Sequence, residues 1–195
     1  MMLPETFIDW WFNPWAISAD VTPDTGSDAL VARRDGYRAW CTSAMIPGDL
    51  PLHFDPVWSS IAMMESATMQ RAASLFMGLI AARQPDQEVL RVLPLNEQKW
   101  CRSIAATQPL QAFAVAHPES TDTLDICGLA ELAIRLELGF PGLWPRLQLH
   151  LPASSQASIA LRRQNNWAGT EDILRSATRS QRCWRLCQQR SEETA

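Results

Sequence analysis

The 195-residue sequence is poor in several residue types, with one lysine (Lys99), one tyrosine (Tyr37) and three histidines. Sixteen of its seventeen basic residues are therefore arginine. Genomic base composition is the simpler explanation of this bias. Arginine also suits protein interfaces, because its planar guanidinium donates five hydrogen bonds in a rigid fork. The net charge of −4 argues against a general nucleic-acid-binding domain, which would be basic.

Long apolar runs are also missing. The longest, at residues 72–82, is too short to cross a bilayer, which needs about 20 residues. The first residues, MMLPETFID, lack the basic and then apolar regions of a secretory signal. The five cysteines are scattered along the chain. We therefore expect a cytoplasmic protein with reduced thiols.

Motifs of catalysis and cofactor binding do not occur in the sequence. It has no phosphate-binding loop, GxSxG elbow, HExxH pair or dinucleotide fingerprint. Cys183 and Cys187 lie one helical turn apart, but His53, His117 and His150 do not supply the further ligands of a zinc site. We expect no catalytic residue, no cofactor, no metal and no enzymatic activity.

What the sequence does contain favours a mainly α-helical fold, with one irregular multi-helix domain over residues 1–195. Its centre is a buried helix at about residues 122–138, apolar on nearly all sides. Ser120, Thr121 or Asp122 is expected to cap this helix, and Gly139 to end it in a left-handed conformation. Other helices are expected at residues 4–12, 28–45, 56–83, 86–93, 96–107, 154–164 and about 170–189, with one or two turns at 109–116.

The segment 147–151 after the central helix has two interpretations. Leu147, Leu149 and Leu151 alternate with polar residues, as in a short half-buried strand. A helix also fits, because Trp144, Leu147 and Leu151 are spaced i, i+3 and i+7. The pattern alone does not decide between them.

Two surfaces are candidates for partner binding. Residues 1–60 carry a net charge of −5 and residues 160–195 a net charge of +3. Four arginines of the C-terminal Arg-rich amphipathic helix can meet an acidic partner, or can form an ordinary solvated face. Trp10 and Trp11 are a second candidate anchor, because tryptophan is enriched at interface hot spots. The four arginines are Arg175, Arg179, Arg182 and Arg185.

Three features in order suggest a family: the aromatic stretch ending in Phe12-Asn13-Pro14, a middle helix with Leu75, Gly78 and Leu79, and the ending W-x-R-L-x-L-x-L-P at residues 144–152 after the apolar helix. Over about residues 7–152, this arrangement resembles the SctK family (also called YscK, OrgA or MxiK), accessory proteins of the bacterial type III secretion sorting platform.

The resemblance implies a non-enzymatic, mostly helical cytoplasmic adaptor of the injectisome, peripheral to the inner membrane through the secretion apparatus. Its expected partners are the cytoplasmic domain of the inner-membrane ring protein (SctD-like) and the pod protein (SctQ-like). The stator (SctL-like) and the ATPase (SctN-like) would be indirect partners. Direct membrane insertion and nucleic-acid binding are not expected.

Two alternatives remain at this point. A type III secretion chaperone or regulatory binding protein would usually be a small α/β dimer. A divergent enzyme would show a deep polar pocket.

Overall fold

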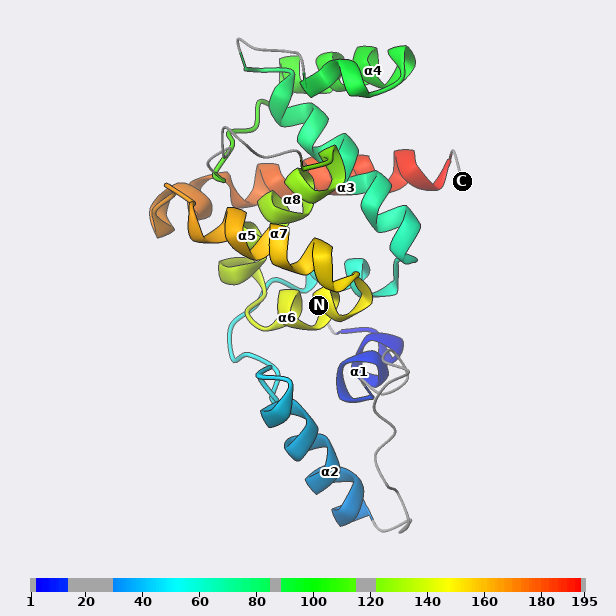
Figure 1. Ribbon diagram of the computed structural model, residues 1–195, viewed down its shortest axis with the longest axis vertical. Coiled ribbons are helices and arrows are strands. Elements are labelled where there is room, and N and C mark those ends of the chain that lie inside the picture. The colour runs from blue at the N-terminus through cyan, green and yellow to red at the C-terminus, as the bar shows by residue number, and fades with distance from the viewer. Residues whose placement is uncertain (1–2, 14–29, 85–88, 115–121, 194–195) are drawn as a thin grey trace.

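The computed structural model describes residues 3–13, 30–84, 89–114 and 122–193. In these ranges the chain is mainly α-helical (Figure 1), which confirms the predicted fold class. The only β pairing in the described ranges is an isolated bridge between Ala114 and Asn166. No helix in the described part of the chain is long and apolar enough to cross a membrane.

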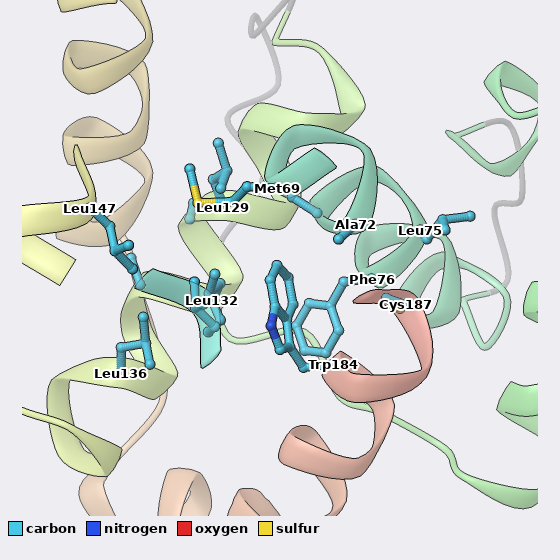
Figure 2. Packing of buried hydrophobic residues seen from close by; sticks show 14 of the residues in the cluster. Met69, Ala72, Leu75, Phe76, Leu129, Leu132, Leu136, Leu147, Trp184 and Cys187 are labelled. Atoms are coloured by element: carbon cyan, nitrogen blue, oxygen red, sulfur yellow. The ribbon is translucent and has the colours of Figure 1, made fainter. Parts of the chain in front are cut away.

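The centre of the fold is α5 (Leu124–Gly139), as predicted. It packs along α3 (Ser66–Ala81), and α8 (Thr170–Glu192) packs against both. Every α5 residue from position 128 to position 136 is buried, because neighbouring elements cover the helix on all sides. Figure 2 shows the packing of side chains from the three helices, including Met69, Ala72, Phe76, Leu129, Leu132, Leu136 and Trp184.

Gly128 allows the close approach of α5 and α3. A Cβ atom at this position would lie 1.9 Å from the carbonyl oxygen of Ala73, well inside van der Waals contact. The backbones of the two helices therefore touch at a point where only glycine fits.

Two polar residues of α5, Glu131 and Arg135, are also buried, and they form an ion pair. Arg135 also donates to Ser180 Oγ of α8 at 3.0 Å and to the Gln111 carbonyl at 2.7 Å. Its guanidinium lies 4.3 Å from the centre of the Phe113 ring. The pair is thus surrounded by further hydrogen bonds, which a buried charge needs.

The helical turns predicted at 109–116 are wrong within the described residues, 109–114. The Glu131 carboxylate accepts the backbone N–H groups of Phe113 and Ala114, each at 2.8 Å. Trp167 donates its own N–H to the Phe113 carbonyl at 3.2 Å. These long-range partners satisfy the backbone groups of Phe113 and Ala114 without a local helix.

The flanking helices cover the rest of the core. After η3 (Val89–Val92), α4 (Leu95–Thr107) packs on α3, and α7 (Ala153–Gln164) packs on α5. The predicted helix at 86–93 lies partly outside the described residues, and its described part is the 3₁₀ turn η3. These elements close the core on two sides.

The single helix predicted at 56–83 is wrong, because the chain forms η2 (Pro56–Met63) and then α3, with extended backbone at Met64. Asp55 caps η2 by accepting the Val57 N–H at 3.0 Å. The Asp55 N–H donates to the Gly139 carbonyl at 2.8 Å, which holds the start of η2 at the end of α5. The chain must then turn so that α3 can run along α5.

Gly139 has a different role from the predicted one. It is the last residue of α5 and has no positive φ; Gly142 has the left-handed conformation, with φ +82°. A Cβ at Gly139 would lie 2.6 Å from Trp58 Nε1, so this glycine makes room for an indole. Asp122 does not cap the helix, whose N-cap is Thr123, but pairs with Arg162 at 2.6 Å. Ser120 and Thr121 lie outside the described residues.

The strand interpretation of residues 147–151 is wrong. The chain there forms α6 (Leu143–Leu147) and the 3₁₀ helix η4 (Gln148–His150). Leu147 and Leu151 are buried in the main core, while Leu149 packs against a second cluster formed by α2 and the loop after it. The leucines alternate because this short helical segment lies between two apolar surroundings.

That second cluster belongs to an arm. Figure 1 shows α2 (Leu30–Ser43) extending away from the other helices, near α1 (Glu5–Phe12) at its inner end. The cluster consists of the α2 side chains Tyr37, Trp40 and Cys41 together with Ile46.

Candidate functional site

The arginine-bearing C-terminal helix was predicted at about residues 170–189, and it is α8, Thr170–Glu192. One face is buried in the core, where Cys183 and Cys187 are fully covered. The Trp184 ring meets the Phe76 ring of α3 edge-on at 5.6 Å. Because this face is fixed, the opposite face is presented on a rigid element.

The four predicted arginines lie together on that opposite face and are all exposed. Arg175 pairs with Glu171 one turn earlier at 3.1 Å, and Arg179 donates to the Pro109 carbonyl at 3.2 Å. Arg182 and Arg185 make no ion pair with any residue that the structure describes. The C-terminal half of the arginine row is therefore the half whose charge is available to a partner.

A groove runs beside these two arginines, between α8 and η2, with Pro4 and Phe7 of the α1 segment lining one of its ends. It consists of two adjoining cavities of about 480 and 340 Å³ that share Val57, Arg185 and Gln189. Gln181 Nε2 donates to Asp55 Oδ2 at 2.6 Å, and Ser60 Oγ donates to Gln188 Oε1 at 3.4 Å. These bonds link the two walls of the groove, which we call the α8–η2 groove.

Trp10 and Trp11 are not equivalent. Trp11 is fully buried, with its ring 5.6 Å from Phe140, so it offers no surface to a partner in this structure. Trp10 is partly buried and stacks on His150 at 6.4 Å, with an interplanar angle of 7°. The structure thus separates the two indoles and does not bring either one to the arginine row.

Arg146 is a residue whose role the sequence did not reveal. Its side chain is buried, and its guanidinium lies 3.7 Å from the centre of the Trp11 ring. It donates to the Tyr37 hydroxyl at 2.8 Å and to the carbonyls of Pro47 at 2.6 Å and Gly142 at 3.3 Å. It therefore joins α1, α2, the loop after α2, and α6 at one point.

The electrostatics at Arg146 follow from this burial. Its partners within the described residues are neutral oxygens and an aromatic face, so desolvation dominates and lowers the pKa of the guanidinium. The same desolvation raises the pKa of the Tyr37 phenol to about 12, because in both groups burial disfavours the charged form. The phenol therefore remains a neutral hydrogen-bond acceptor and donor. The arrangement suits a structural joint rather than acid–base chemistry.

The cysteines lie apart from this surface chemistry. Burial raises the pKa of Cys183 to about 11 and raises that of Cys187 well above its usual value. Both thiols are therefore protonated near neutral pH, whereas metal ligation and nucleophilic attack need the thiolate. Within the described ranges, no group of three or more His, Cys, Asp or Glu side chains is placed to hold a metal ion.

Comparisons with known proteins add no further identification. No family model, no curated protein and no solved structure matches this chain.

Proposed function

We propose that this chain is a non-enzymatic adaptor of the bacterial type III secretion sorting platform, which links the cytoplasmic domain of the ring protein to the pod protein. The proposed family rests on the resemblance at residues 144–152. The structure supports the partner-binding role and does not identify the family. The observation that carries the binding role is the pair Arg182 and Arg185, exposed without an acidic partner among the described residues.

The physical argument starts from the rigidity of α8. Its inner face is held between α3 and α5, so presenting arginines on its outer face costs little further ordering. Unpaired surface cations contribute little to the stability of the folded chain. Facing an acidic surface, the same cations increase the association rate and orient the partner.

The mainly α architecture also supports an adaptor over a secretion chaperone, since chaperones of that class are usually small α/β dimers. The acidic partner is either the ring-protein domain or the pod protein, and the experiment distinguishes them.

The test is co-purification of the full chain with each of the two partners, expressed separately. Arg182→Glu with Arg185→Glu should weaken binding to one partner by about tenfold or more and make the remaining binding less sensitive to salt. Arg175→Glu with Arg179→Glu should have a smaller effect, because those side chains already have partners within the chain.

The matched control is Arg34→Glu with Arg38→Glu, which makes the same change in net charge on α2. Both side chains are exposed there. A wild-type chain that binds neither partner would show that the proposal is wrong. Equal weakening by the control pair would show that net charge, and not the face of α8, determines binding.

A further inference from the structure

The α8–η2 groove has a lining of three chemical kinds, and each kind is suited to a different part of a ligand. Arg182 and Arg185 supply two cations that can each grip a carboxylate with paired hydrogen bonds. A carboxylate of this chain, Glu192, lies only at one end of the groove and accepts from Gln188 Nε2 at 3.2 Å. The centre of the groove is therefore cationic.

The second kind of lining is neutral and polar. Gln181, Gln188 and Gln189 all face the groove. Gln189 is exposed and makes no side-chain hydrogen bond with any residue that the structure describes. A side-chain amide can donate to a peptide C=O and accept from a peptide N–H at the same time. Gln181 and Gln188 already bond to Asp55, Ser60 and Glu192, so Gln189 and the unused Oε1 of Gln181 are the groups that can pair with the backbone of a bound chain.

The backbone of the ligand must then have unpaired groups. A helical segment has already paired its N–H and C=O groups internally, except at its ends. An extended segment leaves these groups free at every residue. The amide lining consequently favours an extended ligand over a helical one.

The length of the groove sets the length of the ligand. Its α8 side runs from Thr178 to Glu192, which at 1.5 Å per residue is about 21 Å. An extended chain advances about 3.3 Å per residue, so about six residues fill it.

The third kind of lining is apolar: Val57 and Leu186 line the groove, and Met63 is 47 % exposed in it.

We propose that the α8–η2 groove binds an extended acidic segment of about six residues from a partner protein, with one aliphatic side chain against Met63. The inference rests on the proposed function in assigning the arginine face to partner binding, and adds the conformation and length of the bound segment. Its carboxylates lie on Arg182 and Arg185, and its backbone lies on Gln189 and on Oε1 of Gln181.

The test uses fluorescence polarisation with the full chain and labelled synthetic peptides. The main probe is fluorescein–Gly-Asp-Glu-Val-Pro-Glu-Leu-Asp-Gly, in which proline prevents a helix. A second probe carries Asn and Gln in place of the acids. A third keeps the same acids and aliphatic residues, with alanine for proline, and carries an added lysine and an added glutamate that are joined as a side-chain lactam to lock a helix.

The main probe should bind, and each of the other two should bind at least tenfold more weakly. Arg182→Glu with Arg185→Glu should abolish binding of the main probe, while Arg34→Glu with Arg38→Glu should leave it nearly unchanged. Met63→Gln should weaken it severalfold, because the exposed thioether is the predicted aliphatic contact. Circular dichroism of each variant confirms that the helices are intact.

Equal or tighter binding of the lactam-locked helix would overturn the inference of an extended ligand. Binding of the main probe that is indifferent to the Arg182 and Arg185 reversals would overturn the groove itself. Either result is separable from a failure of the proposed function. Pull-down of the ring and pod proteins could still respond to the same reversals, which would leave the adaptor in place with a different docking mode.

Discussion

Met45 provides a test of how the arm is built, because its backbone is strained and its side chain is free. Among the described residues it is the only one other than glycine with a positive φ, 53°, and its side chain is 90 % exposed. It follows the end of α2. The Ile46 N–H donates to the Cys41 carbonyl at 2.9 Å, and the Met45 N–H to the Thr42 carbonyl at 3.2 Å. This is a Schellman motif, in which glycine usually occupies the left-handed position.

The effect of Met45→Gly follows from two opposing terms. The left-handed conformation costs a residue with a β-carbon about 1–2 kcal/mol, and glycine removes this cost. Glycine also gains freedom in the unfolded chain, which takes back about 0.4–1 kcal/mol. The exposed side chain adds no significant burial term. We therefore expect a net stabilisation of about 0.5–1 kcal/mol.

Two measurements check this result. Thermal unfolding should show a rise in Tm of about 1–4 °C for a chain of this length. Hydrogen exchange of the last-turn amides of α2 should slow by about two- to fivefold, even if the arm opens separately from the core. Met45→Ala is the control, because it removes the side chain but keeps the β-carbon. If Met45→Gly is no more stable than Met45→Ala, the strain at this position is not what the backbone geometry implies.

Two further predictions concern the core. Arg135→Met should destabilise the fold by about 3–5 kcal/mol, because it leaves the buried Glu131 carboxylate without its cation. Adding Glu131→Gln should cost at least 1 kcal/mol less than the sum of the single changes in urea denaturation; strict additivity would mean that the two side chains act independently. The thiols of Cys101 and Cys183 should resist iodoacetamide at pH 8 until the chain unfolds, since their pKa values are raised from 9.0 to about 12 and about 11. Because the pKa of Cys183 is higher in the folded chain than in the unfolded chain, the contribution of this thiol to the free energy of unfolding is complete below pH 9 and is lost as the pH rises through about 11. Rapid alkylation of the native protein at pH 8 would contradict the burial of these thiols.

The sequence predicted those elements whose signal is local. The sequence of the central helix is apolar on nearly all sides, and α5 is buried because four other helices, α3, α6, α7 and α8, pack against it. The arginine row was predictable for the same reason, since residues at i, i+3, i+4 and i+7 share a face of any helix.

The failures have in common that a distant residue decided the local structure. Residues 109–114 are not helical, and the Glu131 carboxylate accepts two of their N–H groups instead. The 56–83 helix breaks at Met64, between η2, whose start is held by the bond from Asp55 to Gly139 more than eighty residues away, and α3, which packs along α5. Neither partner is visible in a window of ten or fifteen residues.

The α8–η2 groove could not be predicted for that reason either. One wall is formed by η2 and the other by α8, and the bond between Gln181 and Asp55 spans 126 positions of sequence. Periodicity identified Arg182 and Arg185, but only the fold shows that glutamine amides and Met63 lie beside them.

The contacts of Arg146 change the interpretation of residues 144–152, the segment that carries the family resemblance. Trp144, Leu147 and Leu151 of that segment are buried in the core, and Arg146 binds carbonyls and a hydroxyl from three other parts of the chain. A lysine could not replace it, because a single ammonium group cannot reach several acceptors and lie flat on the Trp11 ring at once. The buried residues of the segment therefore fix how the arm joins the body. A resemblance carried by such residues therefore concerns how α2 is attached to α6, and it does not indicate which surface of this chain binds a partner.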